Sequence, residues 1–173
     1  LRIDHFTESF AYEGALLEKA HRINPKSKYR KYTLFSKINT DKYCWVEKPE
    51  NLDAAFQYVK EFPNGPFITE VYEALGGFNW SLYNYIRSQK VALKSKPHDE
   101  LKHEETHTTL IKYIKENAKV PIELQENQAK EGAIKYFGSY LNLAKSPDPW
   151  VTKTLNEIQE GSKKLYGIYG CPD

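Results

Sequence analysis

Apolar residues recur at helical spacing along most of the chain. Residues 51–62 are one example, with a stripe made by Leu52, Ala55, Phe56, Val59 and Phe62. Similar stripes cover residues 7–22, 67–75, 80–88, 99–118, 122–144 and 149–165. Because a period near 3.6 residues is typical of an amphipathic helix, the pattern predicts a mainly α protein. The length of 173 residues fits one domain, so we expect residues 1–173 to form a single helical domain of about six helices.

Residues 32–47 depart from this helical pattern. Two short runs of β-branched and aromatic residues, 33–38 and 43–46, lie on either side of Asn39-Thr40-Asp41. Such runs around a polar turn are typical of two paired strands. The fold class that we predict is therefore mainly α, with a small β-hairpin near residues 32–47.

Turn and helix-end signals divide the rest of the chain. Pro63-Asn64-Gly65-Pro66 predicts a turn, and Gly76-Gly77 predicts the end of the helix that begins near Phe67. Asp148 followed by Pro149 predicts an N-cap and first helical residue for the last helix.

Charge and hydropathy exclude some classes of partner. The chain has 25 basic and 23 acidic residues, a net charge of +2, which argues against nucleic acid as the main partner. No apolar run approaches the roughly 18 residues that a membrane-spanning helix needs. A basic and aromatic stretch from Lys26 to Tyr32 resembles patches that stack on nucleic acid, but it is short, and we interpret it as a solvated strand.

The chain is rich in aromatic residues, with 13 Tyr, eight Phe and three Trp. Tyrosine and tryptophan fill cores, and they are also enriched at protein interfaces. The chain has no Met and begins with Leu1, so a processed organellar or secreted protein is allowed, and the compartment stays unknown. Cys44 and Cys171 allow one disulfide in an oxidising compartment, and two free thiols otherwise.

His103-Glu104-Glu105-Thr106-His107 matches the HExxH spacing of zinc peptidases. On a helix the two imidazoles face the same side and can share one zinc ion, and Glu104 can take a proton from zinc-bound water. Glu126 lies on the next predicted helix and could be the third ligand, a placement that resembles zinc peptidases with a glutamate ligand on the following helix.

Other features of this helix oppose the zinc hypothesis. In zinc peptidases the two residues after the catalytic glutamate are uncharged and the first is bulky and apolar, whereas here the first is Glu105. The face of this helix away from the histidines is polar, with Thr108, Lys112 and Glu116. The alternative is that His103 and His107 form ordinary hydrogen bonds with tyrosine or carboxylate neighbours.

Two hypotheses follow from the sequence. The first is a non-catalytic helical domain that binds other proteins through an aromatic and Lys-rich surface, as an accessory subunit of a larger assembly and without a cofactor. The second is a zinc-dependent metallopeptidase with His103, His107 and Glu126 as ligands and Glu104 as base. Elemental analysis separates them, since the second requires about one equivalent of zinc that is lost in His103→Ala.

Overall fold

The prediction of a mainly α protein is confirmed. The computed structural model describes residues 16, 19, 22–24, 29–38, 49–95 and 108–161. Within these ranges six helices and no strand are present. The helices are α2 (Arg30–Ile38), α3 (Pro49–Glu61), α4 (Ile68–Ser95), α5 (Thr108–Glu116), α6 (Ile122–Leu143) and α7 (Pro149–Gln159).

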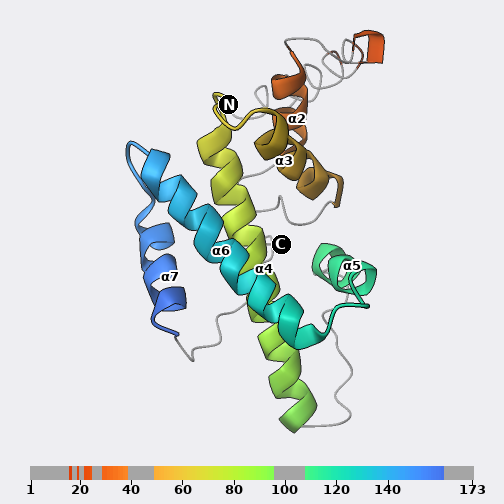
Figure 1. Cartoon of the computed structure of the whole chain (residues 1–173), viewed down its shortest axis with the longest axis vertical. Helices are drawn as coiled ribbons and strands as arrows, with labels where there is room; N and C mark the ends of the chain where they lie inside the picture. Colours follow the sequence, from red (N-terminus) through yellow and green to blue (C-terminus); the bar gives the residue numbers. More distant parts are fainter. Residues whose placement is uncertain are drawn as a thin grey trace, which may run out of the picture.

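The helix α4 is the central element of the fold. It runs antiparallel to α6, which crosses it along much of its length (Figure 1). The pair α2 and α3 packs at the N-terminal end of α4, α5 lies beside the middle of α4, and α7 packs on α6. No side chain between Val71 and Lys90 is fully exposed. A helix covered on every side in this way needs apolar or small residues around its whole circumference, as α4 has.

The predicted helix end at Gly76-Gly77 is wrong, because α4 continues through both residues. A Cβ atom on Gly76 would lie 2.6 Å from Cε1 of Phe137 and closer still to Cδ1. Likewise, a Cβ on Gly132 of α6 would lie 2.6 Å from Cγ of Asn79. The glycines therefore allow α4 and α6 to approach closely, and this packing outweighs the roughly 1 kcal/mol that each glycine costs a helix.

The first strand of the predicted β-hairpin is also wrong, since residues 30–38 form α2. For the same reason the solvated strand predicted from Lys26 to Tyr32 is wrong over residues 30–32, and residues 26–28 lie outside the described residues. Leu34 and Ile38 are one helical turn apart and are both buried against α3 and α4. The same β-branched and aromatic residues therefore bury one face of a helix, which a short apolar run does not exclude. The second strand, residues 43–46, lies outside the described residues, as do Cys44 and Cys171.

The predicted start of α7 is confirmed, whereas the helix ends at Gln159 and not near residue 165. Asp148 caps the helix, with its Oδ1 accepting a hydrogen bond of 2.8 Å from the Trp150 backbone N–H, and Pro149 is the first helical residue. The hydroxyl of Tyr140 on α6 accepts a hydrogen bond of 3.0 Å from the Asp148 backbone N–H. This second bond fixes the start of α7 against the end of α6.

Tyr58 on α3 is completely buried and organises the predicted turn at residues 63–66. Its hydroxyl accepts a hydrogen bond of 3.2 Å from the Phe67 backbone N–H. The turn passes so close that a Cβ on Gly65 would collide with this hydroxyl. The turn, where the Gly65 N–H donates to the Phe62 carbonyl at 2.9 Å, therefore wraps the phenol oxygen.

We expect Tyr58→Phe to lower the free energy of unfolding by about 1–2 kcal/mol, because it leaves the Phe67 N–H without its acceptor in a partly buried site. Urea unfolding followed by circular dichroism measures the change. The control is Tyr32→Phe, which removes a hydroxyl from a side chain that is 39% exposed. Equal effects of the two substitutions would contradict the role given to the Tyr58 hydroxyl.

Asn84 is a buried amide in the middle of α4, with 2% of its surface exposed. Its Nδ2 donates to the Trp80 carbonyl at 3.0 Å, but its Oδ1 has no hydrogen-bond partner. A buried acceptor without a partner lowers stability by roughly 1–3 kcal/mol. We therefore expect Asn84→Leu, which has the same number and branching of side-chain heavy atoms, to raise the unfolding free energy by about 1 kcal/mol. A lower melting temperature for this variant in calorimetry would contradict the expectation.

Of the helices that the structure describes, none has the length and apolar character required to cross a bilayer.

Candidate interaction surface

Large apolar side chains that remain exposed are concentrated in the N-terminal part of the described chain. Eight such residues are at least 37% exposed. Five belong to residues 16–56, namely Leu16, Ile23, Tyr29, Tyr32 and Phe56. The other three, Leu124, Leu143 and Trp150, are spread over α6 and α7. The first group is therefore the strongest candidate for a binding surface among the described residues.

Leu16 and Ile23 are helical and exposed, at 51% and 79%. At 100° per residue, their positions differ by only about 20° around the helix axis. Lys19 lies about 60° from Leu16 on the same reckoning, and Arg22 lies further round. All four side chains are exposed, so two apolar side chains project beside two cations.

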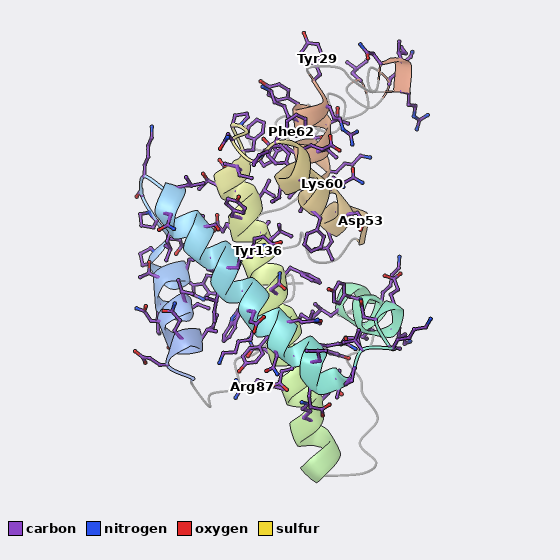
Figure 2. All side chains as sticks on the ribbon, viewed as in Figure 1. Tyr29, Asp53, Lys60, Phe62, Arg87 and Tyr136 are labelled. Carbon is purple, nitrogen blue, oxygen red and sulfur yellow. The ribbon has the colours of Figure 1, made fainter. Side chains whose placement is uncertain are left out.

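Two further exposed aromatic side chains are Tyr29, directly before α2, and Tyr32 in the first turn of α2. Figure 2 shows Tyr29 at the outer end of α2, pointing away from α3 and α4. The Tyr32 ring packs edge-on against Phe67, at 5.6 Å between centroids, and Phe35 stacks on the same Phe67 at 4.0 Å. The exposed Tyr32 ring therefore packs on the half-buried Phe67 ring, which is stacked on Phe35.

An ion pair between Arg30 and Glu61 fixes α2 on α3. Both guanidinium nitrogens Nε and Nη2 donate to the carboxylate, the second at 2.6 Å, and Nη2 also lies 3.4 Å from Oε1 of Gln57. Such a two-point contact is stronger and more directional than a single bond. The hydrogen bond with Glu61 raises the pKa of Arg30. Arg30 therefore joins α2 to α3 within the protein.

We call Leu16, Lys19, Arg22, Ile23, Tyr29, Lys31 and Tyr32 the basic-apolar surface. Lys31 completes it, with its Nζ 5.3 Å from the centroid of the Tyr32 ring, a distance typical of a cation–π contact. Ile23 and Tyr29 are six positions apart in the chain, so their Cα atoms are at most about 22 Å apart. A span of this size fits within one side of a standard protein interface, about 800 Å².

Three of the four residues predicted to form a zinc site, His103, Glu104 and His107, lie outside the described residues. Glu126 is described, on α6. Its carboxylate accepts a hydrogen bond of 2.5 Å from Nζ of Lys90 on α4, and Glu123 lies 3.6 Å from the same nitrogen. Among the described residues no cluster of three His, Cys, Asp or Glu side chains could hold a metal ion. The zinc ligand set therefore stays a prediction, in which zinc would compete with Lys90 for Glu126.

Stability is expected to fall as the pH rises above about 10. Burial raises the pKa of Tyr58 from 10.0, and the hydrogen bond with Glu126 raises the pKa of Lys90 from 10.5. Both groups keep their protons longer in the folded state, so their contribution is complete below the unfolded pKa and is lost as the pH rises through the folded pKa. Urea midpoints between about pH 8 and pH 11 measure this loss. The double variant Tyr58→Phe/Lys90→Gln should show a shallower decline, and an unchanged slope would contradict the assignment.

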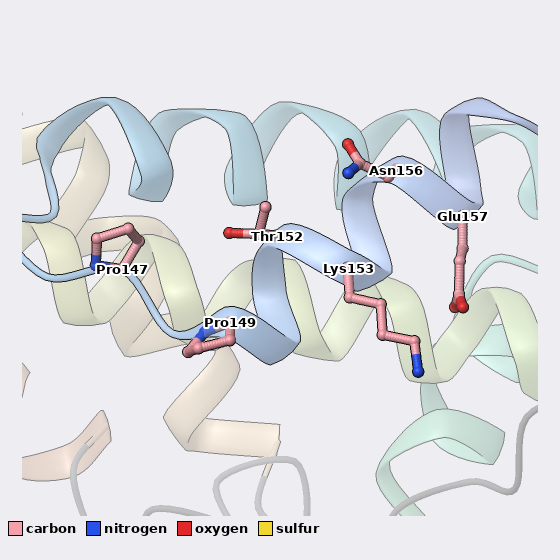
Figure 3. Close-up of a pocket in the computed structure, with 6 residues that line it drawn as sticks. All are labelled: Pro147, Pro149, Thr152, Lys153, Asn156 and Glu157. Carbon is pink, nitrogen blue, oxygen red and sulfur yellow. The ribbon is translucent and has the colours of Figure 1, made fainter.

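A shallow hollow lies on α7, at the opposite side of the molecule from α2 (Figures 1 and 3). It is an open depression of about 560 Å³ lined by Pro147, Pro149, Thr152, Lys153, Asn156 and Glu157. Figure 3 shows these side chains side by side along α7 and the loop before it, with no convergence on one point. The depression therefore presents a shallow, mixed lining and no enclosed site for a small molecule.

Part of the basic-apolar surface was indicated by the sequence and part was not. The stretch of basic and aromatic residues contains Tyr29, Lys31 and Tyr32. The apolar pattern did not predict that Leu16 and Ile23 are exposed, although the position of Leu16 around the helix could have indicated it. Leu16 is about 100° from its neighbour Leu17, so it falls outside the apolar stripe expected for residues 7–22.

The chain matches no protein-family model, no curated protein and no solved structure.

Proposed function

We propose that the chain is a non-catalytic helical domain that docks on other proteins through the basic-apolar surface, as an accessory subunit of a larger assembly. The observation that carries the proposal is that residues 16–32 contain four exposed large apolar side chains, Leu16, Ile23, Tyr29 and Tyr32. Single exposed apolar residues are common on any protein. Several within one short segment are typical of a surface that another molecule covers.

The residue types and their support agree with this proposal. Tyrosine is enriched at protein interfaces, where its ring provides apolar contact and its hydroxyl stays hydrated. Tyr32 is held by Phe67, and Arg30 is held by Glu61. A surface that is ordered before binding loses less conformational entropy on association, so the same contacts give a tighter complex.

The test is photo-crosslinking of the full chain in the cells that produce it, with benzoylphenylalanine in place of Tyr29. The matched control carries the same crosslinker in place of Leu124, because the two side chains are equally exposed, at 47% and 48%. We expect position 29, and not position 124, to form an adduct with a defined protein that mass spectrometry identifies. Adducts that are the same from both positions, or that contain only this chain, would overturn the proposal.

The identified protein is then purified and its affinity measured by calorimetry. We expect the double variant Ile23→Ser/Tyr29→Ser to weaken binding by at least about 10-fold, because interface aromatic and aliphatic anchors typically contribute more than 1 kcal/mol each. Leu124→Ser/Leu143→Ser is the control and should bind as the unchanged chain does. Equal affinities for all three proteins would place the contact elsewhere and reject the basic-apolar surface.

A further inference from the structure

Positive charge is unevenly distributed along the chain. Residues 19–40 contain seven of its 25 basic residues and none of its 23 acidic residues. The remainder therefore has 18 basic and 23 acidic residues, so it is net negative although the whole chain is net positive. A charge block of this kind is typical of a segment that contacts a partner of opposite sign.

The described cations of this segment differ in their availability. Arg30 is paired with Glu61 inside the protein. Lys19 and Arg22 are exposed beside Leu16 and Ile23, and Lys31 lies next to the exposed Tyr32 ring. The cations that border the exposed apolar side chains are thus Lys19, Arg22 and Lys31. A partner that covers these apolar side chains also meets three positive charges.

We propose that the basic-apolar surface binds an acidic segment of a partner protein in which apolar side chains alternate with carboxylates. This inference rests on the proposed function and names the chemistry of the partner. Carboxylates of the partner meet Lys19, Arg22 and Lys31, and its apolar side chains cover Ile23, Tyr29 and Tyr32. Charge complementarity of this kind accelerates association and excludes basic competitors more than it adds affinity.

Nucleic acid and membrane fit the same surface less well. Aliphatic side chains such as Leu16 and Ile23 gain little from a phosphate backbone, which attracts proteins chiefly through charge. A helix that lies in a membrane surface usually buries Trp, Phe and Leu together. Among the described residues the exposed tryptophan is Trp150, which is on α7, and the aromatic residues of the basic-apolar surface are both tyrosines.

The experiment measures binding of four probes to the full chain by fluorescence anisotropy. The first probe is a labelled peptide of repeated Glu-Glu-Leu-Glu-Phe units, and the second has glutamine in place of every glutamate. The third is single-stranded oligothymidylate, and the fourth consists of vesicles rich in phosphatidylserine. We expect the acidic peptide to bind at least about 10-fold more tightly than its glutamine version, and to weaken as NaCl rises from about 50 mM to about 200 mM.

Charge reversal locates the contact. The triple variant Lys19→Glu/Arg22→Glu/Lys31→Glu should weaken peptide binding by at least about 10-fold. The control Lys119→Glu/Lys145→Glu/Lys153→Glu changes the net charge about equally at exposed lysines elsewhere, and should leave binding within about 2-fold. Circular dichroism verifies that both variants fold. The substitution at Lys31 is compatible with folding, because it places an acid in the first turn of α2, where the helix dipole favours one.

Several results would overturn the inference. These are tighter binding of the oligonucleotide or the vesicles, equal binding of the acidic and glutamine peptides, and equal losses in the two triple variants. The protein identified by crosslinking at position 29 distinguishes failure of the acidic-partner inference from failure of the proposed docking function. If its binding is lost in Ile23→Ser/Tyr29→Ser but is unaffected by salt and by the triple reversal, the docking function stands and the acidic partner is rejected.

Discussion

Replacing Gly76 with alanine is expected to lower the free energy of unfolding by about 2 kcal/mol, although alanine is the better helix former. The new Cβ would lie 2.6 Å from Cε1 of Phe137, and the Phe137 ring is completely buried between α4 and α6. Relief requires α4 and α6 to separate, which loosens every contact between the two longest described helices. Urea unfolding measures the change, when the curves of both proteins are fitted with one shared m-value, the dependence of the unfolding free energy on urea concentration.

Gly138 provides the matched control for this prediction. It also lies inside a helix, α6, but a Cβ there meets no atom within 4 Å. Gly138→Ala should therefore raise the unfolding free energy by about 0.5–1 kcal/mol, through helix propensity alone. Opposite signs at the two glycines are the expected result. Stabilisation at both positions would mean that the crossing of α4 and α6 is not as close as the structure has it.

Phe137→Ala is expected to have the largest effect, a loss of about 3–5 kcal/mol. The ring is completely buried, lies over Gly76 and contacts Trp150 edge-on at 5.8 Å between centroids. Its removal leaves a cavity where α4, α6 and α7 meet, because the helix backbones cannot collapse fully. Since small domains are stable by only about 5–15 kcal/mol, the variant is expected to melt many degrees earlier in calorimetry.

Two further variants interpret this measurement. Leu143→Ala on the same helix removes a side chain that is 50% exposed, and should change the unfolding free energy by less than about 1 kcal/mol. Gly76→Ala made in the Phe137→Ala background should no longer be destabilising, because the atoms with which its Cβ collides are gone. If the two losses simply added, Gly76 and Phe137 would not be in direct contact.

Some elements could be predicted from the sequence because their causes are local. The start of α7 depends on two adjacent residues: Asp148 is the N-cap, and Pro149 is the first residue of the helix. The stripe of Phe137 and its neighbours predicted α6 almost to its last residue. A buried helical face and a cap both lie within a few residues of one another, so periodicity and residue type are sufficient to find them.

Other features depend on partners that are distant in sequence. Gly76-Gly77 ends many helices, and nothing in its neighbours reveals that Phe137 lies over Gly76. The run at residues 33–38 suits a strand or a buried helix, and only packing on α3 and α4 decides between them. For the candidate site, the excess of tyrosine predicted an interaction surface, but it does not indicate which tyrosines are exposed, because that depends on packing between helices that are distant in sequence.

The central helix also sets a distance. With 28 residues at 1.5 Å each, α4 is about 42 Å long, and its buried flanks hinder bending. The pair α2 and α3 packs near the N-terminal end of α4, while α6 packs along α4 and is followed by α7. The helix α4 therefore joins the α2–α3 pair to the part of the structure that contains α6 and α7. If the proposed docking at α2 is correct, the length of α4 would determine how far a bound partner stands from α7.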